Sequence, residues 1–151
     1  MEESVINNQL KRVPNYLGSY AVDELHDLKV SYYPSFIIIN LDERHGTGTH
    51  WIAVAIYQNT IYLCDSLGGI NPTRTIPIQL INFLHAFTTK RKLCITKQLQ
   101  PKSSGTCGLY CILFIHEMSQ NHSFTEFLRF FTTDLHQNDI LVKFLNKSVK
   151  L

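Results

Sequence analysis

Short apolar runs alternate along this chain with polar or glycine-containing segments, and several runs have the length and composition of strands. Residues 35–41 are mostly branched and apolar, which is typical of a buried strand. Residues 50–57 and 61–66 predict two more strands, and the short polar segment between them predicts a hairpin. Residues 93–99 predict a further strand.

Other segments show the spacing of helices. In residues 76–88 the apolar positions 78, 81, 84 and 87 recur every three residues, as on one face of a helix. Ser123 followed by Glu126 forms a capping box, which predicts that a helix begins there. Helical segments are also expected at residues 4–12, 22–28 and 134–147, whereas residues 15–20 and 67–72 are expected to form a turn and a loop.

The longest apolar run, residues 106–118, predicts a buried helix with Cys107 in its first turn. The unpaired N–H groups and the positive end of a helix favour a thiolate there, and a thiolate is the reactive form of cysteine. The nearby glycines Gly105 and Gly108 would let a substrate backbone come close. Cys107 is therefore the candidate nucleophile.

These elements predict an α+β fold, with a small mixed, mainly antiparallel sheet packed against helices. The candidate nucleophile would lie at the N-terminus of a buried central helix. The length of 151 residues predicts one domain that spans residues 1–151. A hydrophobic content of 44% excludes a disordered or fibrous protein.

Composition and charge limit the surroundings in which the protein is expected. No apolar run is long enough to span a bilayer, so we expect no membrane partner. The first residues lack the basic and apolar regions of a signal peptide, so we expect a reducing compartment and four free cysteines. Cys64 and Cys111 are expected in the core. The formal net charge of +2 does not by itself indicate a nucleic-acid partner.

A nucleophilic cysteine needs an imidazole to take its proton and a third group to orient the ring. His50 begins the first strand of the predicted hairpin, and Asp65 closes the second. The early part of one strand lies opposite the late part of the other, so these two residues are expected to be cross-strand neighbours. Gln100 precedes Cys107 by seven residues and is the candidate side-chain donor to an oxyanion, with the Cys107 N–H as the second donor.

In order, type and approximate spacing, these residues resemble the adenain family of adenovirus maturation proteases, which belongs to a wider group that includes the SUMO-specific proteases. The resemblance rests on His50-Trp51, Asp65, Gln100 and Cys107-Gly108-Leu109, and it runs from about residue 15 to residue 118. At the position of Asp65, adenain commonly has Glu, whereas the SUMO proteases have Asp as this chain does. Similar proteases occur in related viruses and self-replicating transposons, and such an origin would suit this chain.

The resemblance implies a cysteine endopeptidase that cleaves viral precursor proteins at Gly-Gly-type sites during virion maturation. Cys107 would attack the scissile carbonyl, His50 would protonate the leaving amine, and water would hydrolyse the thioester acyl-enzyme. Trp51 would cover His50. This chemistry requires neither a cofactor nor a metal. By the same resemblance we expect a monomer in the virion and in the host nucleus or cytoplasm.

The adenovirus enzymes are also activated by DNA and by a short viral peptide, which can be disulfide-linked to a cysteine. Cys94-Ile95-Thr96 resembles the tract that carries this cysteine, so Cys94 is the candidate attachment point. The basic residues 90–92 offer surface for non-specific DNA contacts, although solvated lysines on helix faces and loops are the commoner explanation.

Other functions share these features. An isopeptidase that acts on ubiquitin-like modifiers would use the same catalytic residues and the same Gly-Gly ends. A catalytically silent binding module would keep only the fold, and the combination of His50, Asp65, Gln100 and Cys107 argues against it. A Cys/His zinc site is disfavoured because the chain has no CxxC or HxxxH pair.

Overall fold

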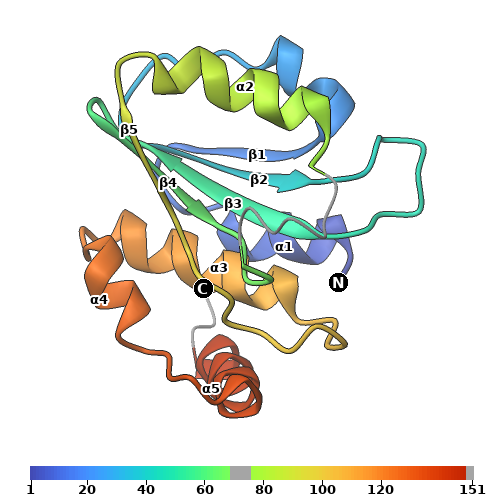
Figure 1. The fold of residues 1–151 in the computed structure, drawn as a ribbon, viewed down its shortest axis with the longest axis vertical. Helices are drawn as coiled ribbons and strands as arrows, with labels where there is room; N and C mark the ends of the chain where they lie inside the picture. Colours follow the sequence, from blue (N-terminus) through green and yellow to red (C-terminus); the bar gives the residue numbers. More distant parts are fainter. Residues whose placement is uncertain (69–75, 149–151) are drawn as a thin grey trace.

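A mixed sheet of five strands forms the centre of the molecule (Figure 1). The structure is a computed structural model and describes residues 1–68 and 76–148. The strands lie side by side in chain order: β1 (Tyr16–Ala21), β2 (Ser35–Asn40), β3 (Trp51–Ile56), β4 (Thr60–Cys64) and β5 (Lys92–Ile95). The three central strands pair antiparallel, whereas the edge strands β1 and β5 run parallel to their neighbours.

Each parallel pair is joined by a crossover that contains a helical segment, because parallel strands cannot be linked by a tight turn. The 3-10 helix η1 (Val22–Asp27) connects β1 to β2, and α2 (Ile78–Thr88) lies between β4 and β5. These two segments pack against each other and cover the same face of the sheet (Figure 1).

The opposite face is covered by α1 (Glu3–Leu10) and α3 (Cys107–Ser119). Helices α4 (Phe124–Leu128) and α5 (Leu135–Ser148) pack against α3. Facing α3, strand β3 carries Ala53 and Ala55, whose small side chains let the helix approach the sheet closely. None of the helices that the structure describes is long and apolar enough to cross a membrane.

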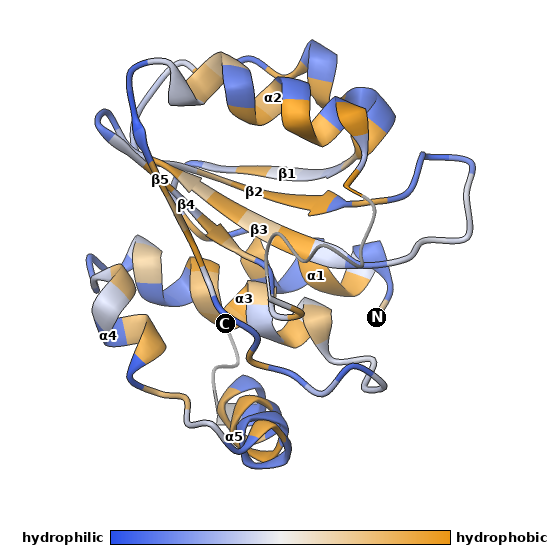
Figure 2. Cartoon of the chain, in the orientation of Figure 1, coloured by the Kyte–Doolittle hydropathy of each residue, from blue (hydrophilic) through white to orange (hydrophobic). Residues whose placement is uncertain are grey.

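Strand β2 sends alternate side chains into two hydrophobic cores, one on each face of the sheet. Ile37 and Ile39 pack on the α2 side, and Phe36 and Ile38 pack on the α3 side. A strand covered on both faces has no reason to alternate apolar with polar residues. Figure 2 accordingly shows β2 apolar along most of its length.

The predicted α+β class is confirmed, and most predicted elements are present with ends that differ by one or two residues. The central antiparallel strands and the helix that begins at Cys107 are among them. Ser123 caps α4 as expected, and its hydroxyl accepts a hydrogen bond from the Glu126 N–H (3.0 Å).

The prediction of a turn at residues 15–20 is wrong, because these residues form most of β1. Asn15 and Gly18 do have positive φ angles of 63° and 119°, which explains the turn-like sequence. Parallel pairing with β2 outweighs this local preference, and the register shifts between Tyr16 and Gly18. Strand β5 ends at Ile95 rather than at residue 99. The predicted loop at residues 67–72 lies mostly outside the described residues.

Candidate active site

His50 and Asp65 meet at one end of the sheet. His50 immediately precedes β3, and Asp65 immediately follows β4. Extending the antiparallel pairing beyond Ala53 and Cys64 puts His50 and Asp65 on the same face, as diagonal neighbours. The His50 Nε2 atom lies 2.7 Å from Asp65 Oδ1, and both side chains are buried. The structure thus brings together the two residues that the hairpin pattern singled out.

Neighbouring groups fix the carboxylate and backbone of Asp65. Its Oδ1 atom also accepts a hydrogen bond from the Leu67 N–H (3.1 Å). The buried Thr96 hydroxyl accepts from the Asp65 N–H and donates to the Asp65 carbonyl oxygen, both at 2.9 Å. Sequence reasoning missed Thr96, because its place beside Asp65 depends on the long-range parallel pairing of β4 with β5.

Cys107 begins α3, and its half-buried thiol interacts with the His50 side chain and with the backbone N–H groups of Trp51 and Gly108. Burial alone would raise the pKa of this thiol. The hydrogen bond with His50 and the two backbone N–H groups outweigh burial, and the pKa of Cys107 lies below its ordinary value. The site therefore favours the thiolate.

The same contacts act on His50 in the opposite direction. Burial alone would lower the pKa of His50, but the hydrogen bonds with Asp65 and Cys107 outweigh it and raise the pKa above its usual value. Because Nε2 of His50 pairs with Asp65, the other ring nitrogen of His50, Nδ1, is the one available to the thiol. A raised histidine pKa and a lowered cysteine pKa together favour a thiolate–imidazolium pair.

The Cys107 thiol opens into a cleft of about 410 Å³. His50, Trp51 and Gly105 line it together with Cys107, and Asn40, the N-terminal residues 1–3 and the loop residues 47–49 complete the wall. Among the described residues, and apart from its two chain neighbours, no atom lies within 4 Å of the position that a Cβ on Gly105 would take, so this glycine leaves open space beside the nucleophile. A cleft of this kind has room for an extended peptide backbone next to the thiolate.

The N-terminus packs against the beginning of α3, where Figure 1 also places it. The Trp51 indole donates a hydrogen bond to the Met1 carbonyl oxygen (3.1 Å). Gly108 faces Met1, and a Cβ on Gly108 would come within 3.0 Å of the Met1 sulfur. Gly108 thus allows the N-terminus to approach α3 closely. No sequence signal pointed to Met1, because its neighbours at the site lie about 50 and 107 residues further along the chain.

Gln100 is buried beside the turn that leads into α3. Its side-chain oxygen accepts a hydrogen bond from the Ser66 hydroxyl. Its Nε2 atom donates to the carbonyl oxygen (2.7 Å) and the hydroxyl (3.2 Å) of Ser104. The amide nitrogen thus points into the turn before the nucleophile and is held there by Ser104. Its role as oxyanion donor stays a prediction.

The other cysteines have different surroundings. Cys64 and Cys111 are buried, and burial raises the pKa of each thiol well above its ordinary value. Cys94 is a free, half-exposed thiol on the edge strand β5, paired with Tyr62 of β4. Within residues 1–68 and 76–148, no group of three His, Cys, Asp or Glu side chains gathers where a metal ion could be held.

Comparison with protein families and curated proteins points to viral proteases. The model of the adenovirus endoprotease family matches residues 25–141. The chain is 28% identical to a protease of bovine adenovirus B serotype 3, over 61% of this chain and 59% of that protein. It is 27% identical to a SUMO-1 cysteine protease of African swine fever virus, over 64% of this chain and 38% of that protein. The chain therefore spans less than two thirds of the length of either relative.

Solved structures show the same fold at low sequence identity. The crystal structure of the African swine fever virus protease aligns with a TM-score of 0.62 and 14% identity, over 93% of this chain and 63% of that chain. The SUMO protease Ulp1 aligns with a TM-score of 0.50 and 17% identity, over 99% of this chain and 79% of that chain. These neighbours confirm the predicted cysteine protease fold.

Proposed function

Since this chain belongs to the adenovirus endoprotease family, we propose that it is a cysteine endopeptidase in which Cys107 is the nucleophile. His50 is the general acid and base, and Asp65 orients it. The observation that carries the proposal is the buried contact of 2.7 Å between His50 Nε2 and Asp65 Oδ1, in a histidine whose pKa the Cys107 thiol also raises. A carboxylate, an imidazole and a thiol in this order form the arrangement that activates a cysteine.

The reaction is an acyl transfer in two steps. The Cys107 thiolate attacks the scissile carbonyl carbon, and the imidazolium of His50 gives its proton to the leaving amine. Water then attacks the thioester, with His50 as the base, and releases the acid product. The negative oxygen formed in each step receives hydrogen bonds from the Cys107 N–H and the Gln100 amide. Asp65 keeps His50 in the orientation that serves both steps.

The proposed substrates are viral precursor proteins cut after Gly-Gly-type motifs during virion maturation. The preference for glycine beside the nucleophile is carried over from the family, and the open space at Gly105 leaves room for the substrate backbone. Trp51, which is held by the Met1 carbonyl oxygen, lies next to His50 and limits water there. The bovine adenovirus relative supports a viral context for this activity.

Cleavage of matched peptides tests the proposal. A fluorogenic peptide that ends in Gly-Gly before the reporter is compared with one that ends in Ala-Ala, and Cys107→Ala is the control protein. We expect the wild type to cleave only the Gly-Gly peptide, and Cys107→Ala to cleave neither while keeping its thermal midpoint. Equal cleavage by Cys107→Ala, or cleavage of neither peptide by the wild type both alone and with cysteine-containing peptides from the viral precursors as activators, would contradict the proposal.

A second candidate function is removal of a SUMO-like modifier from a lysine side chain. The similarity to a SUMO-1 cysteine protease and to the fold of the SUMO protease Ulp1 favours it. Both functions transfer an acyl group from a Gly-Gly end. They differ in that only a deconjugase also binds the folded surface of the modifier. A SUMO–reporter conjugate hydrolysed roughly 100-fold more efficiently than the Gly-Gly peptide would identify a deconjugase, since remote contacts then assist catalysis. Similar efficiencies would favour the endopeptidase.

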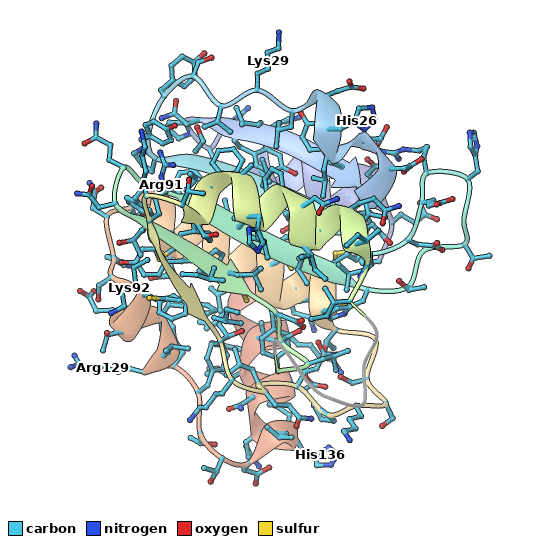
Figure 3. All side chains as sticks on the ribbon, turned by 45° about the horizontal axis from the view of Figure 1, so that its top comes forward. His26, Lys29, Arg91, Lys92, Arg129 and His136 are labelled. Carbon is cyan, nitrogen blue, oxygen red and sulfur yellow. The ribbon has the colours of Figure 1, made fainter. Side chains whose placement is uncertain are left out.

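We also propose Cys94 as the attachment point for an activating peptide. Its thiol is free and half-exposed on an edge strand, where a disulfide partner has access. Cys94→Ser should weaken activation by cysteine-containing peptides taken from the viral precursors, and identical activation curves would dismiss this role. DNA as a second activator would have to contact cations that lie apart, because Lys29 lies at the top and Arg129 at the lower left of the view in Figure 3. Arg91, which lies among the basic residues 90–92, is already bonded to the Tyr57 carbonyl oxygen (2.8 Å).

A further inference from the structure

The C-terminal helix α5 contacts the segment from Leu99 to Thr106, which leads to Cys107, through two consecutive buried side chains, Asn138 and Asp139. Asn138 Nδ2 donates a hydrogen bond to the carbonyl oxygen of Leu99 (3.0 Å). Asp139 Oδ1 accepts one from the hydroxyl of Thr106 (2.9 Å). One helix therefore holds both the residue before the proposed oxyanion donor and the residue before the nucleophile.

A continuous chain of hydrogen bonds links Asp139 to Gln100. From the Thr106 hydroxyl, which is bonded to Asp139, the Ser104 hydroxyl lies 2.8 Å away. The Gln100 amide donates to the Ser104 hydroxyl (3.2 Å) and to its carbonyl oxygen (2.7 Å). At the far end, the Ser66 hydroxyl donates to the Gln100 side-chain oxygen. Most of these side chains are buried, so water does not readily replace the hydrogen bonds between them.

The carboxylate at one end determines which atom donates in each bond. An ionised carboxylate only accepts, so Thr106 must give its single hydroxyl proton to Asp139. The Thr106 oxygen is then free to accept from the Ser104 hydroxyl (2.8 Å), whose other acceptor is the more distant Pro101 carbonyl oxygen (3.2 Å), and the Ser104 oxygen accepts from the Gln100 amide. The Asp139 carboxylate also accepts from the Tyr110 hydroxyl (2.7 Å), which ties it to α3. A single buried carboxylate therefore orders the donors along the chain.

We propose that Asp139 is a positioning residue that sets the orientation of the Gln100 amide relative to Cys107; this inference rests on the function proposed above. The ordered hydroxyls keep the Gln100 amide nitrogen facing the turn between Gln100 and Cys107. From there the amide can give up its hydrogen bond to the Ser104 carbonyl oxygen and donate to the oxyanion instead. Without the carboxylate, the Thr106 hydroxyl can donate to Ser104 and the Ser104 hydroxyl can turn to the Pro101 carbonyl oxygen, so the turn that holds the Gln100 amide loses its fixed link to α5.

This role predicts a specific kinetic signature. The oxyanion forms only during acyl transfer, whereas alkylation of a thiolate by iodoacetamide forms none at the enzyme. Misorienting Gln100 should therefore lower kcat for a Gly-Gly peptide and leave both KM and the alkylation rate of Cys107 unchanged. A residue that merely supported the fold around Cys107 and His50 would change the alkylation rate as well.

The experiment uses Asp139→Asn, which keeps the shape of the side chain and removes its charge. Asp134→Asn on the same segment is the matched control, because Asp134 is exposed and Asn retains its capping ability. We expect Asp139→Asn to lower kcat roughly tenfold, less than loss of a whole oxyanion donor. In a Gln100→Ala background, Asp139→Asn should lower kcat no further, because its effect acts through Gln100.

Thr106 provides an independent pair of variants if Asp139→Asn does not fold. Thr106→Val removes the hydroxyl link and should reproduce the loss of kcat, whereas Thr106→Ser keeps the hydroxyl and should restore most of it. An equal loss from Asp139→Asn with and without Gln100 would overturn the proposal. So would a parallel fall in the alkylation rate of Cys107.

The side-chain amide signal of Gln100 in NMR spectra provides a readout that needs no turnover. Gln100→Ala identifies this signal by its disappearance. Asp139→Asn should shift it and speed its proton exchange, whereas Asp134→Asn should not. An unchanged signal in Asp139→Asn overturns the positioning role. A wild-type protein that cleaves no Gly-Gly peptide, both alone and with cysteine-containing peptides from the viral precursors, contradicts the proposed function instead, and the NMR comparison then still decides whether Asp139 orients the amide.

Discussion

The two halves of the candidate site are held by different kinds of structure. His50 and Asp65 lie at the ends of adjacent antiparallel strands, where the backbone pairing of β3 and β4 fixes their separation. Cys107 and Gln100 lie on either side of an irregular turn, which side-chain hydrogen bonds tie to α5. The link from Thr106 to Asp139 joins residues 33 positions apart.

This difference separates two tasks in the proposed chemistry. The strand-bound half sets the charge of the nucleophile, because His50 lowers the pKa of the Cys107 thiol. The turn-bound half supplies the proposed donors to the oxyanion, which are the Gln100 amide and the Cys107 N–H. Loss of His50 or Asp65 should therefore lower thiol reactivity and turnover together, whereas loss of the Gln100 amide should lower turnover alone.

His50→Ala should have the largest effect and break the strand-bound half. With the imidazole gone, nothing protonates the leaving amine, and kcat/KM should fall roughly 10⁴-fold. The pKa of Cys107 should rise, so its alkylation at mildly acidic pH should slow as well. Peptide turnover and mass-spectrometric mapping of alkylated cysteines measure the two effects. Undiminished turnover would assign the base to a different histidine.

Asp65→Asn should also lower turnover, but by less than loss of His50, since the imidazole remains and loses only its orienting carboxylate. It also tests the cause of the raised His50 pKa. A raised folded-state pKa stabilises the protein fully below the unfolded value of about 6.5, and this stabilisation is lost as pH rises through the folded-state pKa. The gap in thermal midpoint between wild type and variant should therefore be larger at about pH 6 than at about pH 9. A gap independent of pH would argue against this coupling.

Gln100→Ala sharpens the contrast from the other half. Loss of one oxyanion donor should lower kcat by a factor on the order of 100. The alkylation rate of Cys107 should stay at the wild-type value, because the thiolate and His50 are untouched. If kcat does not change, backbone N–H groups alone stabilise the oxyanion. If alkylation slows, the two halves are not separable.

Thr96→Val should give the smallest effect on turnover and the clearest effect on stability. It removes the hydroxyl that pairs with the N–H and carbonyl oxygen of Asp65. The Asp65 carbonyl oxygen keeps the Gly68 N–H as a donor (2.9 Å). Loss of the hydroxyl that accepts from the Asp65 N–H should cost about 1–3 kcal/mol in the free energy of unfolding. Chemical denaturation measures this loss, with the exposed Thr125→Val as the matched control. Equal stability of the two variants would mean that Asp65 is held by its other contacts.

The same contrast explains what could be predicted from the sequence. Periodicity locates the hairpin and the helix at Cys107, because those patterns depend on neighbours along the chain, and the hairpin alone pairs His50 with Asp65. Thr96 and Asp139 carry no local signal, since each gains its role from a segment more than 30 residues away. Strand β1 was missed for the same reason, because its pairing with β2 overrides a turn-like sequence.

The pH dependence of iodoacetamide labelling at each of the four cysteines tests the central claim most directly. Cys64 and Cys111 should react slowly because they are buried, and the half-exposed Cys94 serves as the reference thiol. At about pH 6, well below the ordinary cysteine pKa, Cys107 should be labelled selectively in the wild type and slowly in His50→Ala. Equally slow labelling of Cys107 in both proteins at that pH would contradict an activated thiolate paired with His50.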